Sequence, residues 1–128
     1  TWQSILDDMS ALPPGKTMAD KFYIGFFDGA ALAAVVDMIL AYPNETTGYI
    51  GFFMVDKSRQ GQGIGSRILA DIENTMRNNG MCHSRLAVDK GNPQSYSFWT
   101  KNGYAVCGPE IPNDFSAYIP MQKELTPL

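Results

Sequence analysis

Cysteine, histidine and strong charge are all scarce in this chain. Among its 128 residues are two cysteines, Cys82 and Cys107, which stand at no metal-ligand spacing. We expect both to be reduced, partly buried thiols of a cytoplasmic protein. His83, the only histidine, opens an apolar run, so we give it a structural role and predict no metal site.

Long apolar runs are missing as well. No run approaches the roughly 20 apolar residues that cross a bilayer, and no signal peptide opens the chain. Charged residues make up 18% of the sequence and the formal net charge is −3, which disfavours nucleic acid as a partner. A hydrophobic content of 45% is typical of a folded domain. We therefore expect one globular domain over residues 1–128, with neither nucleic acid nor a membrane as its partner.

Apolar patterning predicts mainly strands in the first half of the chain. We expect a short opening helix over residues 2–9 and a strand over residues 21–27. The Asp28-Gly29 pair then predicts a hairpin turn. Residues 30–42 have the alanine, leucine and methionine content of a helix, but the turn before them favours a second strand. A central strand, apolar on both faces, is expected over Tyr49–Val55.

The clearest element is an amphipathic helix that follows three glycines and ends at Asn78, Asn79 and Gly80. Its apolar residues recur at helical spacing and are expected to face the core: Ile64, Ile68, Leu69, Ile72 and Met76. Its polar residues are expected to face solvent: Arg67, Asp71, Glu73, Asn74 and Arg77.

Beyond this helix the pattern predicts a strand, a second helix, a strand, a loop and a last strand. Their bounds are Ser84–Val88, Pro93 to about Lys101, Tyr104–Cys107, Gly108–Asp114 and Ala117–Gln122. Asn92 precedes Pro93 and is expected to cap the second helix. The order of elements predicts an α/β protein in which helices pack on a mixed sheet.

The turn Gln60-Gly61-Gln62-Gly63-Ile64-Gly65 joins the central strand to the first long helix. A helix N-terminus offers free N–H groups, and glycines let a phosphate approach the backbone, so the turn predicts a diphosphate site. The alternative is a tight turn that only packs the helix on the strand. The dinucleotide pattern G-x-G-x-x-G fails because Ser66 stands where its third glycine would be. The residues Gly15-Lys16-Thr17 imitate the NTPase phosphate loop, but Ser10 replaces its first glycine.

The same turn resembles the signature [Q/R]-x-x-G-x-[G/A] of the GNAT superfamily of N-acetyltransferases. Gln60, Gly63 and Gly65 fill that signature, after Arg59. The resemblance covers about residues 20 to 122. It implies a mixed, mostly antiparallel sheet with two splayed central parallel strands and flanking helices.

A second stretch, Leu86–Tyr104, is similar to the family's pattern of a strand, an asparagine, a helix and then G-[F/Y]. Asn92, Phe98, Gly103 and Tyr104 fall in register with it. Two motifs at the expected separation make the resemblance specific.

The resemblance implies direct transfer of an acetyl group from acetyl-CoA, the coenzyme A substrate, to a primary amine. Coenzyme A would enter between the splayed strands and bond to main-chain groups of Phe53 and Val55. The Val55 N–H would stabilise the thioester oxygen, and the Asn92 amide would reach the pantetheine unless it only caps its helix. Lys57, Arg59 and Lys101 would meet the other phosphate or be ordinary solvated charges. The pyrophosphate would lie on Gln60, Gly61, Gln62, Gly63, Ile64, Gly65 and Ser66.

One departure concerns the acid that protonates the leaving thiolate. The family commonly has a tyrosine seven residues after the asparagine, where this chain has Trp99. Trp99 can pack against the pantetheine while water protonates the thiolate, Tyr96 can serve as the acid, or the protein can bind acyl-CoA and transfer poorly. No base is identified: Glu45, Asp37, Asp89 and relayed water stay as candidates.

A second departure lies at the start of the chain. The family usually begins with a strand and a helix that are not recognised here, and the sequence begins at Thr1 rather than at methionine. Without that strand the run 21–27 would present an open edge. We expect a second copy of the chain, forming a homodimer, or a preceding segment to cover it.

Three functions from different classes fit these observations. The first is an acetyl-CoA-dependent N-acetyltransferase acting on a small-molecule or peptide amine, with an acceptor site built by the opening helix and by the loops 43–48 and 109–114. The second is a non-catalytic acyl-CoA-binding module. The third is a nucleotide-phosphate binder that uses the same glycine turn.

Overall fold

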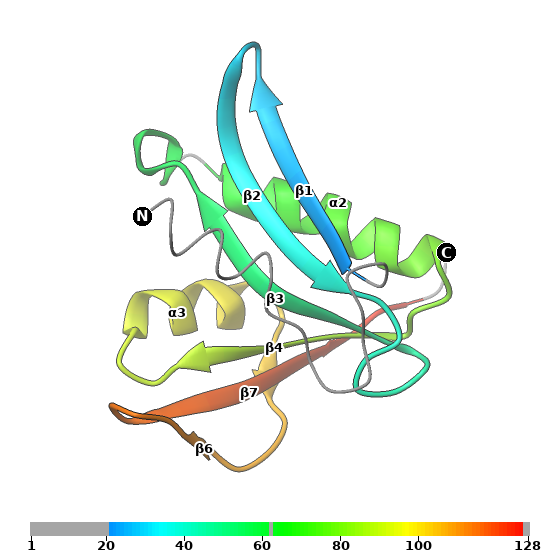
Figure 1. Ribbon diagram of the computed structural model, residues 1–128, viewed down its shortest axis with the longest axis vertical. Coiled ribbons are helices and arrows are strands. Elements are labelled where there is room, and N and C mark those ends of the chain that lie inside the picture. The colour runs from blue at the N-terminus through cyan, green and yellow to red at the C-terminus, as the bar shows by residue number, and fades with distance from the viewer. Residues whose placement is uncertain (1–20, 62, 127–128) are drawn as a thin grey trace.

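The computed structural model describes residues 21–61 and 63–126 of the chain (Figure 1). The predicted opening helix, the Gly15-Lys16-Thr17 stretch and Gln62 lie outside the described residues. The elements in chain order are β1 (Lys21–Asp28), β2 (Ala31–Ile39), β3 (Thr47–Val55), the short 3-10 helix η2 (Lys57–Arg59), α2 (Ile64–Asn78), β4 (His83–Asp89), α3 (Pro93–Lys101), β5 (Ala105–Val106), β6 (Ile111–Pro112) and β7 (Ala117–Glu124).

The strands form one seven-stranded sheet in the order β1-β2-β3-β4-β7-β5, with β6 also paired to β7. Every pairing is antiparallel except that of β3 with β4, which is parallel. The predicted mixed, mostly antiparallel α/β architecture is therefore confirmed. In the part of the chain that is described, β1 lies at one end of the sheet. That a second copy or a preceding segment covers it stays a prediction.

Strand β2 settles the one ambiguous segment of the sequence in favour of a strand. Gly29 takes a positive φ of 62° in the turn before it, which closes the hairpin with β1. Residues 33–39 are all buried, on both faces of the sheet. A strand between two neighbours and covered on both faces carries a continuous apolar run, and that is why its alternation was hidden.

Helix α2 buries the face that was predicted, with one exception. Ile68, Leu69, Ile72 and Met76 belong to the core. The prediction that Glu73 faces solvent is wrong, because this residue is only 4% exposed. Its carboxylate is held inside by Tyr104 and Lys123, which come from later parts of the chain and were not visible in the helical pattern.

The C-terminal segment differs from the prediction in two places. The stretch 108–114 contains strand β6, which forms because Ile111 and Pro112 pair with Tyr118 and Ala117 at the start of β7. The two cysteines, expected to be partly buried, are both exposed. Both residues bond through their main-chain N–H groups, Cys82 to Thr46 and Cys107 to Pro120, and this leaves their side chains at the surface.

A single apolar core joins the sheet to both described α-helices. Val36, Met38, Ile50, Leu86 and Met121 contribute to it from four strands. Helix α2 adds the residues named above, and α3 adds Trp99. Figure 1 shows the hairpin of β1 and β2 extending beyond the rest of the sheet, with α3 beside the ends of β3 and β4. No helix in the described ranges is long and apolar enough to cross a membrane.

Candidate active site

The parallel strands β3 and β4 separate soon after they begin. Their ladder consists of Thr47 with His83, Gly48 with Ser84 and Tyr49 with Arg85. Beyond that point β4 continues to pair with β7, and β3 continues to pair with β2. The second half of β3 therefore presents an edge that β4 does not fill. The predicted splay of the two central strands is confirmed.

The main chain of β3 is oriented toward this gap at the predicted positions. The Asp56 N–H donates to the Ala33 carbonyl on β2, at 2.7 Å. Main-chain groups of successive strand residues point to opposite edges, so those of Val55 and Phe53 point away from β2 and into the gap. A bulge accompanies the opening: Phe52 pairs with Asp37 and Ile50 with Met38, which leaves Gly51 between them.

The glycines of the turn are required for two different reasons. Gly61 and Gly63 have positive φ of 81° and 75°, and a Cβ there would meet nothing within 4 Å. Gly65 sits in the first turn of α2, where a Cβ would lie 3.1 Å from Cε1 of Phe98. The first two glycines thus permit the turn and leave open space above it, and the third lets α2 approach α3. Gly63 is the N-terminal cap of α2 and has no side chain with which to occupy the first N–H groups of the helix.

Helix α3 begins at the gap with its predicted cap. The Ser95 N–H donates to Oδ1 of Asn92 at 3.0 Å, and Pro93 takes the first helical position. In the described ranges, Nδ2 of Asn92 forms no hydrogen bond, so the cap uses one end of the amide and leaves the other for a ligand. Both roles that the sequence left open for Asn92 are compatible with this geometry.

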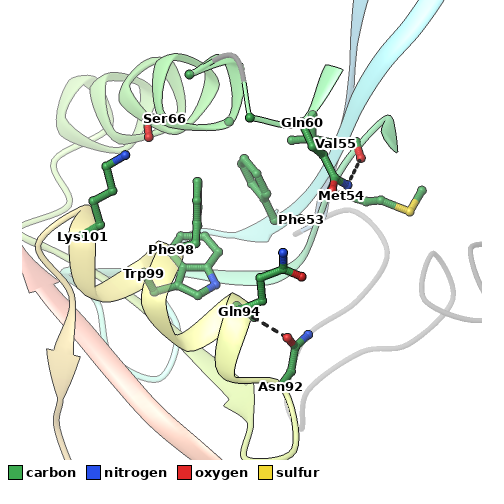
Figure 2. Close-up of a pocket in the computed structure, with 14 residues that line it drawn as sticks. Phe53, Met54, Val55, Gln60, Ser66, Asn92, Gln94, Phe98, Trp99 and Lys101 are labelled. Atoms are coloured by element: carbon green, nitrogen blue, oxygen red, sulfur yellow. Dashed lines mark hydrogen bonds between the residues drawn. The ribbon is translucent and has the colours of Figure 1, made fainter. Parts of the chain in front are cut away.

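These elements enclose a cavity of about 430 Å³. Figure 2 shows β3 and the glycine turn on one side and α3 on the other, with Lys101 extending from α3 in the direction of α2. The lining consists of Phe53, Met54, Val55, Gln60, Gly61, Gly63, Gly65, Ser66, Asn92, Gln94, Ser95, Phe98, Trp99 and Lys101.

Most of the predicted site residues are brought together here, two of the described ones are not, and Gln62 lies outside the described residues. Ile64 packs against the core and does not line the cavity. Tyr96, the candidate acid, is 37% exposed and does not line it either. Lys101 does line the cavity, whereas Lys57 is exposed and stands apart from it.

Sequence reasoning missed Met54, Gln94, Ser95 and Phe98 as lining residues. A signal existed for Gln94 and Ser95. They stand one turn before Phe98, which falls in the second motif, and Trp99 on α3, so they share a helical face with those two residues.

An aromatic cluster forms the floor of the cavity. The ring of Phe98 lies 5.1 Å from that of Trp99 and 5.8 Å from that of Phe53. Trp99 also contacts Phe53 at 5.5 Å and Tyr104 at 5.1 Å, both edge to face. Trp99 is 6% exposed. Its indole is thus held in place from three sides.

A buried polar network lies under this floor. The Tyr104 hydroxyl donates to Oε2 of Glu73 at 2.9 Å and lies 2.7 Å from the Ser84 hydroxyl. Oε1 of Glu73 accepts from Nζ of Lys123, also at 2.9 Å. Burial, and then the nearby Glu73 carboxylate, raise the pKa of Tyr104 well above its ordinary value. Tyr104 is therefore a fixed neutral donor beneath Trp99.

The candidate bases are scattered. Asp37 is 3% exposed, and its carboxylate lies beside the bulged Gly51, where a Cβ would be 3.6 Å from Oδ2. Asp89 is exposed and accepts the Gly91 N–H at 2.8 Å. Glu45 is exposed in the loop before β3. In the described ranges, no group of three or more His, Cys, Asp or Glu residues is placed to hold a metal ion.

The model of the acetyltransferase (GNAT) family matches residues 5–104. A comparison with curated protein sequences finds no match.

Solved structures of similar shape come from several acetyltransferases. Ard1 from Thermoplasma volcanium has a TM-score of 0.76 at 20% identity, with 98% of this chain and 80% of that chain covered. PaiA N-acetyltransferase from Thermoplasma acidophilum, in complex with coenzyme A, has a TM-score of 0.68 at 23% identity, with 82% and 61% covered. The ribosomal-protein-S18-alanine N-acetyltransferase from Escherichia coli has a TM-score of 0.74 at 13% identity, with 100% and 79% covered. The chain thus shares its fold with these proteins and spans about three fifths of the PaiA chain.

Proposed function

Because the chain belongs to the acetyltransferase (GNAT) family, we propose that it transfers an acetyl group from acetyl-CoA directly to a primary amine. One observation carries this proposal. The gap between β3 and β4 leads into a cavity. The N-terminus of α2, which suits a phosphate, lies at one end of it, and the edge of β3 that β4 leaves unpaired lies along its side. A small-molecule amine or the amino end of a peptide is the proposed acceptor.

The pyrophosphate of coenzyme A is assigned to the glycine turn. Its ligands would be the N–H groups from Gly61 to Ser66 and the positive end of the α2 dipole. Lys101 is the only cationic side chain among the described residues that line the cavity, and it would supply charge from the opposite wall. Gln62 and Ile64 would contribute through their main chain alone.

The pantetheine arm is assigned to the free edge of β3. Phe53 and Val55 direct their main-chain groups there, so the arm can add to β3 as a short strand would. Asn92 lines the cavity at the start of α3, and its Nδ2 would bond to one of the amides of the arm.

The chemistry needs a neutral amine, a stabilised carbonyl oxygen and a proton for the leaving thiolate. The amine nitrogen forms a bond to the thioester carbon, the Val55 N–H stabilises the negative oxygen, and the nitrogen gives up a proton to water. The C–S bond then breaks, and coenzyme A leaves as a thiolate that takes up a proton. Of the two sources of the final proton that the sequence left open, water and Tyr96, water is favoured. Trp99 is packed among aromatic rings and has no acidic proton, and Tyr96 stands outside the cavity.

A non-catalytic acyl-CoA-binding module is the second candidate. The observation that favours it is Trp99 at the position where the family commonly has a tyrosine. In the described part of the cavity wall, Lys101 is the one ionisable side chain, so proton transfer there would depend on water or on the acceptor.

Calorimetric titration with acetyl-CoA, ATP and NAD tests the binding part of the proposal. We expect saturable binding of acetyl-CoA alone, since ATP and NAD have no pantetheine arm that could bond to the edge of β3. Thioester consumption with a panel of amines then separates the two candidates. Turnover supports the transferase, whereas tight binding without turnover of any amine supports the binding module. Equal binding of ATP would contradict both.

A further inference from the structure

We propose that the acceptor carries a carboxylate, which Arg85 and Tyr49 bind on the face of the sheet opposite α2 and α3. This proposal rests on the acetyl transfer argued above, and it names the chemical class of the acceptor. It comes from two residues that stand side by side on neighbouring strands, at the point where those strands separate.

Tyr49 and Arg85 are the last paired residues of β3 and β4 before the gap opens. Along β4, Ser84, Leu86 and Val88 are buried on the side of the helices. Arg85 therefore projects from the opposite face, in a row with Gln122 of β7. Next along that face come Ala87 and Pro120, then Asp89 and Tyr118.

Tyr49 and Arg85 are paired in register on neighbouring strands, and the charge of Arg85 acts on the pKa of the Tyr49 phenol. The pKa of Tyr49 is raised, chiefly by burial and then by Tyr42, and the charge of Arg85 acts in the lowering direction. Tyr118 and Cys107 are the other titratable groups that act on it. The Tyr42 ring holds Tyr49 from the side, with an edge-to-face contact at 5.5 Å. Tyr49 thus remains a protonated donor beside a fixed positive charge.

Arg85 is half-buried, and no carboxylate in the described ranges forms an ion pair with it. A guanidinium taken partly out of water favours a planar anion that can accept two of its N–H groups. A phenol beside it supplies a further donor. The guanidinium presents donors only, and the protonated phenol beside it can donate as well, which suits a carboxylate and disfavours a second amine.

The separation fits an acceptor of modest length. Val55, whose N–H is assigned to the thioester oxygen, and Tyr49 are six positions apart on β3, roughly 20 Å in an extended strand. Four extended peptide residues cover roughly 13 Å. The Arg85 side chain spans the remainder. An amine at the thioester and a carboxylate at Arg85 can therefore belong to one molecule the size of a tetrapeptide.

Tetraglycine and tetraglycinamide form a matched pair of probes, because they differ only in the terminal carboxylate. With saturating acetyl-CoA, we expect kcat/KM to be about tenfold higher for the acid, mainly through KM. In Arg85→Gln the two probes should fall within about twofold of each other. Arg85→Lys keeps the charge without the planar fork and should show an intermediate preference. Arg77→Gln is the control, since Arg77 is also half-buried but lies on α2, bonded to Asn74.

Equal turnover of the two probes by the wild type overturns the proposal, as does a preference that survives in Arg85→Gln. If neither probe is acetylated, both are titrated against the complex with coenzyme A while the Arg85 Nε resonance is followed by NMR. A shift caused by the acid and not by the amide supports the carboxylate site, and no shift overturns it. Calorimetric titration of the same samples with acetyl-CoA distinguishes failure of the carboxylate site from failure of the proposed function. Absence of acetyl-CoA binding contradicts the proposed function itself.

Discussion

The side chain of Gln60 donates a hydrogen bond from Nε2 to the carbonyl oxygen of Val55, at 3.0 Å. This bond ties the first residue of the glycine turn back to the last residue of β3. It occupies the carbonyl of Val55 and leaves its N–H directed into the gap. One contact thus fixes the spacing between the proposed pyrophosphate site and the proposed thioester site.

Replacing Gln60 with alanine should weaken acetyl-CoA binding several-fold and leave the fold intact. The bond is exposed and local, so its loss costs about 1 kcal/mol. The cost should appear in the dissociation constant measured by calorimetry rather than in the melting temperature. Gln122→Ala on β7, distant from the turn, is the matched control for acetyl-CoA binding. Unchanged affinity in Gln60→Ala would show that the bond does not hold the turn.

Gly63→Ala should lower both stability and acetyl-CoA affinity. A φ of 75° strains an alanine by about 1 kcal/mol, which lowers Tm by roughly 4 °C. Gly80→Ala is matched to it, since Gly80 has a φ of 82° and an equally open environment at the far end of α2. Both variants should lose similar stability in thermal unfolding, and only Gly63→Ala should lose affinity. Equal affinity in the two variants would mean that the turn has no part in binding.

The sequence carried enough information to predict the elements that build the site, because their signals are local. A glycine turn before a helix and an asparagine before a proline each act within a few residues. Cap, turn and helix start could therefore be assigned, and they agree with the structure at Gly63, Asn92 and Pro93.

The contacts that join distant segments could not be predicted in this way. Glu73 looks like a surface residue on its helix, but it is buried by a hydroxyl 31 positions later and an ammonium 50 positions later. Strand β6 forms because of its pairing to β7, and Pro112 argues against a strand in isolation. The proximity of Phe98 to Gly65, which closes one end of the cavity, likewise depends on how two helices meet.

Tyr96→Phe should leave turnover unchanged within about twofold in an assay of thioester consumption. Tyr96 is exposed and stands outside the cavity, so its hydroxyl is not placed to protonate a thiolate there. A loss of about a hundredfold or more, typical of removing a general acid, would restore Tyr96 as the acid.

Trp99→Tyr tests the same step from inside the cavity. It places a phenol where the indole now packs against Phe53 and Phe98, and it keeps an aromatic ring there. If protonation of the thiolate limits turnover, kcat should rise while the dissociation constant of acetyl-CoA stays nearly the same. Trp99→Phe, which offers no such proton, is the control and should not gain. A gain in both variants would point to relieved packing instead.

Tyr104→Phe should make the protein less stable near neutral pH but less sensitive to alkali. The loss near neutral pH is about 1–3 kcal/mol, because Glu73 and Ser84 stay buried without the Tyr104 hydroxyl to which both are hydrogen-bonded. The alkaline effect follows from the direction of the pKa shift, since the folded state holds the Tyr104 proton more tightly than the ordinary value of 10.0 allows. Below that value both states are protonated and the stabilisation is complete. Above it only the unfolded state loses the proton, so the wild type should lose up to about 1.4 kcal/mol per pH unit from this residue.

Urea unfolding from pH about 8 to about 11 should show a shallower fall in the free energy of unfolding for Tyr104→Phe than for the wild type. Tyr96→Phe, outside the network, should follow the wild type. Parallel curves for Tyr104→Phe and the wild type would contradict a Tyr104 that stays protonated beneath the cavity floor.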